Sequence, residues 1–185
     1  MSDITFLNAS GTSQSAGAIA TAGGLLTPYY TQERFVSVAT PQTGAGLGVS
    51  LSTPYAAGDA IGTKIEFPNV RKPDGSVVVL RQLQVYLNES GIGSNSIEAW
   101  LFNADPAAPV DNSAYLPAYA SGMIGCIGKV TLTGAVGTGA TLHTWTGTLY
   151  AAPSATSVFA VLVATGAFTL TTASERRASL YGDHG

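Results

Sequence analysis

The chain has 185 residues, of which 45% are hydrophobic and only 10% are charged, against about 25% charged residues in an average soluble domain. This length fits one domain of ordinary size and leaves little room for a second. The net charge of −3 and the scattered basic residues provide no positive stripe for phosphates, so we expect no direct nucleic-acid binding. A surface this poor in charge is expected to be partly buried against other subunits.

The first residues, MSDITFLNASGTSQS, have neither the basic start nor the apolar stretch of a signal peptide. No later segment reaches the roughly 20 apolar residues that a membrane-spanning helix needs. We therefore expect a protein that is made in the cytoplasm and has no membrane partner.

Residues 1–30 are rich in Ser, Gly, Ala and Thr, with Asp3 as the only charge, and follow neither the helical nor the strand period for long. This composition predicts an N-terminal arm at 1–30, followed by a folded domain at 31–185. Within the arm, residues 17–26 (GAIATAGGLL) could form a short helix, although each of the paired glycines costs about 1 kcal/mol of helix stability.

From residue 31 onward, short runs rich in Val, Ile, Thr, Leu and aromatic residues alternate with Gly, Pro, Asn and Asp. In LRQLQVYLN, the apolar Leu83, Val85 and Leu87 alternate with polar residues, which predicts one inward and one outward face. In SVFAVLVAT the apolar run is unbroken, as in a strand covered on both sides. The predicted strands are 33–40, 61–67, 77–87, 96–103, 124–132, 142–150, 157–165 and 176–181.

Eight short strands without a crossover helix predict an all-β fold, an antiparallel β-sandwich of the jelly-roll type. In this arrangement we expect Trp100 and Trp145 to lie in the core, since each falls within an apolar strand pattern.

No pattern of catalytic residues is present. The histidines, His143 and His184, have no neighbours suited to activating a nucleophile, and we expect His143 to lie at the surface or partly buried. Cys126 with two distant histidines cannot provide the three or four ligands of a zinc site, and we expect a small buried side chain there. We therefore predict no enzymatic activity, no catalytic residues, no cofactor and no metal.

The segment LFNADPAAPVDNSA at 101–114 ends an apolar run with prolines, aspartates and asparagines. Its oxygen-bearing side chains could bind calcium, but the regular spacing of calcium loops is absent. Asp105 before Pro106, and Asp111 before Asn112, are also ordinary turn formers. We favour a long strand connection held by proline and Asx turns.

Two glycine clusters, GAGLG at 44–48 and GAVGTG at 134–139, lack the following helix that a phosphate loop requires. We expect flexible connections at both.

The segment 55–87 (YAAGDAIGTKIEFPNVRKPDGSVVVLRQLQVYL), followed by LFNADPAAPVDNSAY and IGCIGKVTL, resembles small structural proteins of tailed bacteriophages. In these proteins a YxxGDxxG start, a strand pair, an LFxxxP strand end and an IGxIxxV strand recur in that order. The resemblance covers roughly residues 53–132 and brings no catalytic residues with it.

The resemblance implies a virion protein made in the host cytoplasm, with a head decoration or cement protein of the capsid surface as the leading hypothesis. Its partners would be the major capsid protein and further copies of itself, for which a homotrimer suits the threefold positions of a capsid. The arm would then order on binding, with anchors on the partner at Phe6, Leu7, Leu25, Leu26, Tyr29 and Tyr30. Equally, these side chains could fold back onto their own domain.

The connection at 103–117 is the second expected contact with a neighbour, through Asp105, Pro106, Pro109, Asp111 and Asn112. Two other functions remain open. A carbohydrate-binding β-sandwich would gain support if Trp100 and Trp145 were exposed and coplanar on one face. A tail or fibre component would differ from a head protein in its position on the particle.

Overall fold

The fold is taken from a computed structural model. It describes residues 33–39, 49, 53–71, 77–87, 97–117, 122–137, 140–153, 156–170 and 176–184, together with four short strands before residue 33 as backbone only. Side chains are also not described at 135–137, 140 and 176. The chain divides into two compact units, Met1–Glu33 and Arg34–Gly185.

The N-terminal unit contains two antiparallel strand pairs: β1 (Ile4–Leu7) with β2 (Ser13–Ala16), and β3 (Ala18–Ala20) with β4 (Leu26–Pro28). The possible helix at 17–26 is therefore wrong for residues 18–20, which are extended. Paired glycines within that segment oppose a helix, whereas an antiparallel neighbour satisfies the backbone of a strand.

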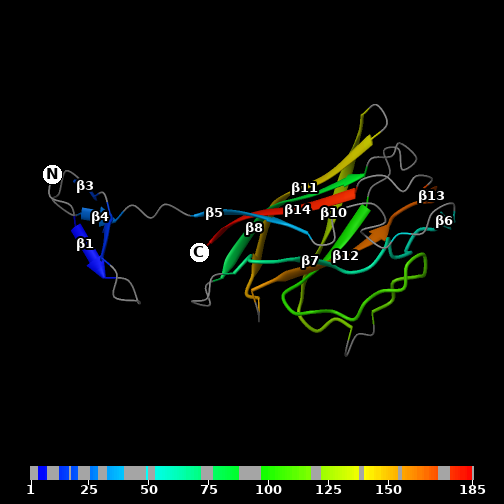
Figure 1. The fold of residues 1–185 in the computed structure, drawn as a ribbon, viewed down its shortest axis with the longest axis horizontal. Helices are drawn as coiled ribbons and strands as arrows, with labels where there is room; N and C mark the ends of the chain where they lie inside the picture. The colour runs from blue at the N-terminus through cyan, green and yellow to red at the C-terminus, as the bar shows by residue number, and fades with distance from the viewer. Residues whose placement is uncertain are drawn as a thin grey trace. The chain divides into compact units, whose positions relative to one another are not determined.

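Eight strands of the second unit form one antiparallel sheet in the order β5-β14-β8-β11-β10-β9-β12-β7 (Figure 1). Their bounds are β5 Arg34–Val38, β7 Ile65–Phe67, β8 Val78–Leu87, β9 Ile97–Phe102, β10 Cys126–Gly137, β11 Ala140–Ala151, β12 Val158–Ala164 and β14 Arg176–His184. A separate small pair is formed by β6 (Pro54–Tyr55) and β13 (Phe168–Thr169).

The sheet is nearly closed. Its two edge strands approach each other where the Ser37 hydroxyl of β5 donates a 2.5 Å hydrogen bond to the carbonyl of Pro68, just after β7. Strand β10 connects the two halves of the sheet. Its residues Cys126 to Leu132 pair with β9, and its residues Thr133 to Gly137 pair with β11.

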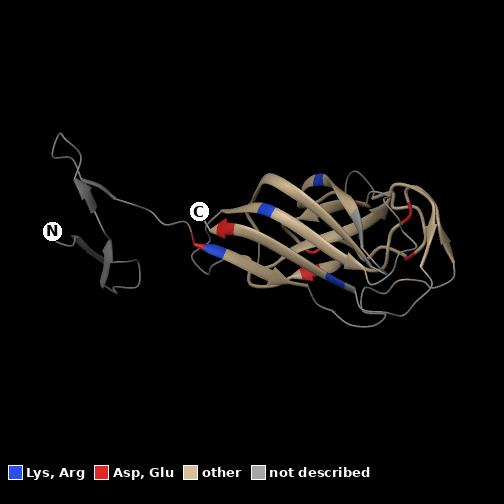
Figure 2. Cartoon of the chain, turned by 90° about the horizontal axis from the view of Figure 1, so that it is seen from above, with Lys and Arg blue, Asp and Glu red and all other residues tan. Residues whose placement is uncertain are grey.

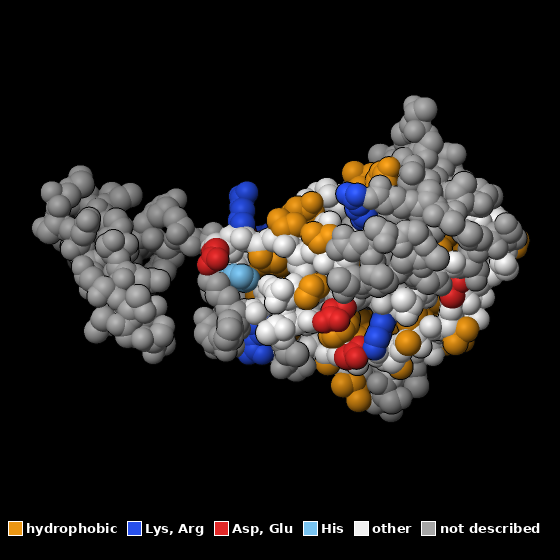
Figure 3. Space-filling view, in the orientation of Figure 1, with side chains coloured by type: hydrophobic (Ala, Val, Ile, Leu, Met, Phe, Trp, Pro, Cys, Tyr) orange, Lys and Arg blue, Asp and Glu red, His pale blue; other side chains and the backbone are white. Residues whose placement is uncertain are grey.

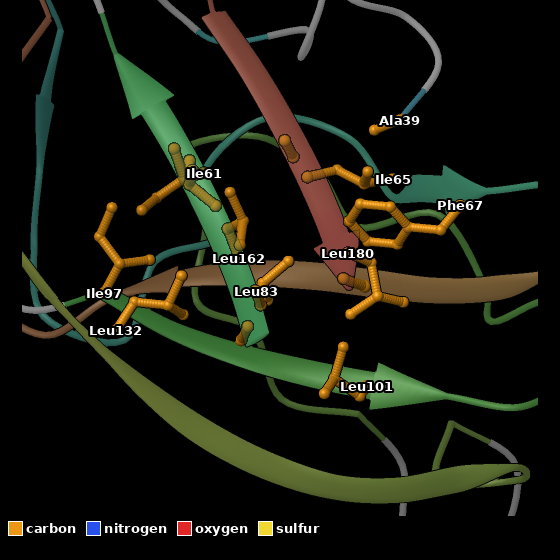
Figure 4. Close-up of a cluster of buried hydrophobic side chains, with 14 of the residues drawn as sticks. Ala39, Ile61, Ile65, Phe67, Leu83, Ile97, Leu101, Leu132, Leu162 and Leu180 are labelled. Atoms are coloured by element: carbon orange, nitrogen blue, oxygen red, sulfur yellow. The ribbon is translucent and has the colours of Figure 1, made fainter. Parts of the chain in front are cut away.

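The main core fills the inside of this curved sheet. Leu83 and Leu180 come from β8 and β14, and they belong to the same buried cluster as Ile97 and Leu162 from β9 and β12 (Figure 4). Each of these side chains is almost completely buried. The alternation predicted for β8 is confirmed, since Leu83, Val85 and Leu87 are buried and the residues between them are half-buried.

All seven residues of β12 are buried, as its unbroken apolar run predicts. Val158, Ala160, Leu162 and Ala164 belong to the main core, while Phe159, Val161 and Val163 form a second cluster on the opposite face.

The eight strands of the sheet are the eight predicted from the sequence, with shifted ends. Residues 61–64 precede β7 in turns instead of continuing it, and β10 and β14 run further than predicted. Gly134 to Gly137 lie in β10, so the connection predicted at 134–139 is wrong for those residues. The cluster at 44–48 lies outside the described residues. No helix in the described part of the chain is long and apolar enough to cross a membrane.

Candidate interaction surfaces

The connection between β9 and β10 is not a free loop. Its residues 112–115 pair with the segment 58–60. The Asn112 N–H donates to the Ala60 carbonyl, the Ala60 N–H donates to the Ser113 carbonyl, and the Tyr115 N–H donates to the Gly58 carbonyl, each at 2.9 Å. Gly58 has a φ of +95°, which glycine adopts without strain, and Asn112 takes the left-handed region at +54°. Two segments far apart in sequence thus form one layer.

Asp111 fastens this layer through its carboxylate. Oδ1 accepts a 2.8 Å hydrogen bond from the Tyr55 hydroxyl and a 2.6 Å hydrogen bond from the Gly62 N–H. The Tyr55 ring is buried and stacks on Phe168 at 5.1 Å between ring centroids. The sequence suggested a turn former that bonds its local backbone, whereas these two partners lie 56 and 49 residues away.

Asp105 makes a different, exposed contact. Its Oδ1 lies 2.5 Å from the Lys64 ammonium, and the side chain of Asp105 is 58% exposed. Lys64 also donates to the Pro106 carbonyl. In the described residues no group of three His, Cys, Asp or Glu side chains is placed to hold a metal ion.

A second apolar cluster lies under this layer. Phe102, Phe159, Val161 and Val163 are its buried members, and Trp100, Tyr115 and Cys126 pack against them. The Trp100 ring meets Tyr115 edge-on at 5.7 Å, and the Lys129 ammonium lies 5.5 Å from its centroid. Burial, and in second place the charge of Cys126, raises the pKa of Tyr115 above its usual value of 10.0.

Neither tryptophan is fully buried, so the expectation of two core residues is only partly met. Trp100 packs against the second cluster, and Trp145 packs against the main core. Both side chains are half-buried, which an alternating pattern alone does not reveal. Cys126 is likewise half-buried.

The predicted contact residues of the connection differ in exposure. Pro106 is buried, Pro109, Asp111 and Asn112 are half-buried, and Asp105 is exposed. Their role in binding a neighbour stays a prediction. Sequence reasoning missed the exposed apolar side chains of the same connection, which are Val110 (72% exposed), Leu116 (85%) and Ile124 (65%). Isolated apolar residues within a proline-rich polar segment are the signal that could have identified Val110 and Leu116, whereas Ile124 fell within the strand predicted at 124–132.

The outer face of β5, β14, β8 and β11 is the second candidate surface. Strand register aligns its outward side chains in rows across the strands. The rows are Val36, Tyr181, Gln82 and Thr146; then Val38, Ser179, Gln84 and Thr144; then Arg177, Tyr86 and Leu142. No carboxylate occurs in these three rows. Figure 2 shows the few charged residues of the domain spread over both strands and loops.

A hollow of about 380 Å³ lies on this face. It is lined by Gln84, Tyr86, Leu142, Arg177 and Ser179, from β8, β11 and β14. In the view of Figure 3, hydrophobic side chains form several separate groups, and a few charged side chains lie beside them.

The structure describes only some of the predicted anchor residues of the arm. Leu25, Tyr29 and Tyr30 lie outside the described residues. Phe6 and Leu7 fall in β1 and Leu26 in β4, and their side chains are not described. Whether they contact a partner stays a prediction.

The histidines lie apart from these surfaces. His143 is fully buried, which corrects the expected surface or partly buried position. It pairs with Gly134 across β10 and β11, where a Cβ atom would lie 2.7 Å from the imidazole Nε2, so a glycine opposite makes room for the ring. His184 stacks on Phe35, with Nε2 3.0 Å from the Val70 carbonyl.

No protein-family model, curated protein or solved structure matches the chain.

Proposed function

We propose that the protein is a non-catalytic structural protein of a phage virion, a head decoration protein that binds the outside of the capsid and stabilises its lattice. The observation that carries the proposal is the exposure of Val110, Leu116 and Ile124 on one connection of a chain with only 10% charged residues. Exposed large apolar side chains on a surface poor in charge are typical of contact with other proteins. The same connection lies within the stretch that resembles phage structural proteins.

The strand order supports a jelly roll as the architecture. If the strands of the sheet are numbered along the chain, β5, β7, β8, β9, β10, β11, β12 and β14 become 1 to 8. The observed order is then 1-8-3-6-5-4-7-2. Two facing halves of 1-8-3-6 and 5-4-7-2 have the connectivity of a jelly roll, which viral capsid proteins use.

In this role the domain from residue 31 onward is the body of the protein, and the N-terminal arm binds a neighbour. Residues 1–30 anchor there through Phe6, Leu7, Leu25, Leu26, Tyr29 and Tyr30. Copies are arranged as trimers, and many weak contacts act together because each bound copy faces the next at high effective concentration.

Attachment to particles tests the proposal. Purified heads that lack the protein are mixed with the wild-type chain or with Leu116→Asp, and bound protein is measured after sedimentation. Leu116 is 85% exposed, so the substitution leaves the fold intact while placing a charge on the contact surface. Ala152→Asp, at an exposed residue just after β11 and outside both candidate surfaces, is the matched control.

We expect wild type and Ala152→Asp to bind and Leu116→Asp to bind at least tenfold more weakly. We also expect heads without the protein to burst at a lower temperature. If the wild-type chain bound to tails or fibres and not to heads, the protein would be a tail or fibre component and not a head protein.

The carbohydrate-binding alternative based on Trp100 and Trp145 receives no support from their placement. The two rings pack against different clusters, and Trp100 is engaged by Tyr115 and Lys129.

A further inference from the structure

The two edge strands of the sheet differ in how well they are protected against pairing with another chain. Strand β7 has three residues, with Glu66 at its centre, and is followed directly by Pro68. Short length, a charge and a proline are common protections of an edge strand. Strand β5 has five residues, RFVSV, with no bulge in its pairing, and Arg34 at its first position is its only charge. Strand β5 therefore lacks these protections.

The backbone of β5 has a row of donors and acceptors on its free side. The Ala39 N–H donates to the Ala178 carbonyl of β14 at 2.9 Å, and in an antiparallel pair every second residue bonds to the same neighbour. The odd-numbered residues of β5 therefore direct their backbone groups toward β14. The even-numbered residues Arg34, Val36 and Val38 direct theirs to the other side. In the described part of the chain, β14 is the only strand that pairs with β5.

The same even-numbered residues also expose their side chains. Val36 is 59% exposed and Val38 is 40% exposed. The contact that nearly closes the sheet does not involve these residues, because it is made by the buried Ser37, whose hydroxyl donates to the Pro68 carbonyl. An edge strand with free backbone groups and exposed β-branched side chains is a template for a further strand.

The sequence of β5 fits a second copy of itself. If two β5 strands run antiparallel around a twofold axis at Val36, then Val36 lies opposite Val36 of the second copy, and Arg34 lies opposite Val38. All three residues then occupy hydrogen-bonded positions, so the pair uses every free donor and acceptor of both edges. The two Val36 side chains form a β-branched cross-strand pair, and the two arginines lie at opposite ends. A parallel pair would place the two arginines side by side.

We propose that β5 is an interaction surface for a second copy of this chain, and that two β5 strands pair antiparallel about Val36 into one continuous sheet. The contact goes beyond the capsid role, because it needs only copies of this chain and no capsid. In the proposed arrangement of trimers, such a twofold contact would join copies that belong to neighbouring trimers.

Hydrogen exchange of the full-length protein tests the contact, with single amides followed by NMR at a low and a high protein concentration. The Val36 and Val38 amides should exchange at least tenfold more slowly at the high concentration. The Phe35 and Ser37 amides bond to β14 and should be protected at both concentrations. Protection of Val36 that does not depend on concentration would overturn the proposal, because a segment of the same chain would then cover the edge. Rapid exchange of Val36 at both concentrations would also overturn it.

Val36→Lys would place two ammonium groups opposite each other in the twofold pair, so the concentration-dependent protection of Val38 should disappear. Val110→Lys is the matched control, because Val110 is 72% exposed but lies on the connection between β9 and β10. Unchanged thermal unfolding of both variants separates a pairing defect from misfolding. Equal loss of protection in the two variants would contradict a contact through β5. Leu116→Asp should keep the protection, so this proposal and the capsid role can fail independently.

Thiol cross-linking tests the register. Cys126 is the only cysteine, so Val36→Cys and Val38→Cys are compared in a Cys126→Ser background. Val36→Cys should cross-link between copies, because opposite residues in hydrogen-bonded positions have Cα atoms about 5.5 Å apart. Val38→Cys should not, because its two copies would be offset by roughly 13 Å along the strands. With a cross-linker shorter than that offset, stronger cross-linking through Val38→Cys than through Val36→Cys would overturn pairing about Val36.

Discussion

The Tyr55 hydroxyl donates a 2.8 Å hydrogen bond to Oδ1 of Asp111, and this contact joins two segments that are 56 residues apart in the chain. The same oxygen accepts the Gly62 N–H. One carboxylate therefore holds the β9–β10 connection against the segment before β7. The second apolar cluster lies beneath this layer, and Tyr115 of the connection packs on it.

Asp111→Ala should destabilise the domain markedly. The Tyr55 hydroxyl and the Gly62 N–H would both lose a charged acceptor in a partly buried site, at a cost of about 3 kcal/mol in the free energy of unfolding. Asp105→Ala, which removes only an exposed ion pair with Lys64, should cost less than about 1 kcal/mol. Urea unfolding of the two variants compares them directly, and equal losses would mean that Asp111 does not fasten the layer.

Gly182→Ala should be poorly tolerated. A Cβ atom at this position would lie 2.4 Å from the Val79 carbonyl oxygen and 2.6 Å from the Phe35 ring, and the backbone of a paired strand cannot move away. We expect a loss of about 3 kcal/mol from this overpacking. Gly128→Ala is the control, since its nearest neighbour is the flexible Leu149 side chain at 3.2 Å. Thermal unfolding should show a much smaller change in that variant.

Alkaline pH should weaken the fold through Tyr115. Because burial raises the pKa of Tyr115 in the folded chain, folding favours the neutral phenol. This contribution is complete below about pH 10 and is lost as the pH rises through the raised pKa. The free energy of unfolding of Tyr115→Phe should therefore fall less than that of wild type between about pH 9 and pH 11. Parallel curves would show that Tyr115 ionises equally easily in both states.

Removal of residues 1–30 should leave the domain folded, because the compact unit from Arg34 onward contains the whole eight-stranded sheet. The truncated chain should retain its unfolding temperature but attach more weakly to capsids. Circular dichroism and sedimentation with heads measure the two properties separately. If the truncated chain attached as well as the full-length chain, the arm would have no role in attachment.

A chelator should not alter the unfolding temperature. Asp111 is engaged with Tyr55 and Gly62, and Asp105 is engaged with Lys64, so both carboxylates have partners other than a metal. Calorimetry with and without a chelator provides the comparison. A decrease of several degrees in the unfolding temperature would indicate that this connection binds calcium.

The sequence by itself determined the eight strands of the sheet, with shifted ends, the inward face of β8 and the burial of β12 on both sides. A strand can be predicted from the alternation of apolar and polar residues, as in β8, or from a continuous apolar run, as in β12. Both patterns are formed by residues that are neighbours in the sequence. The two-residue strands β6 and β13 were missed because they are too short to show a period.

Only the tertiary structure decided what the 103–117 connection does and where the two surfaces lie. The partners of Asp111, the burial of His143 opposite Gly134, and the meeting of Gln84, Leu142 and Arg177 at one hollow all join residues from different strands or segments. These contacts depend on strand order and register, which the closing of the sheet determines and no local pattern encodes.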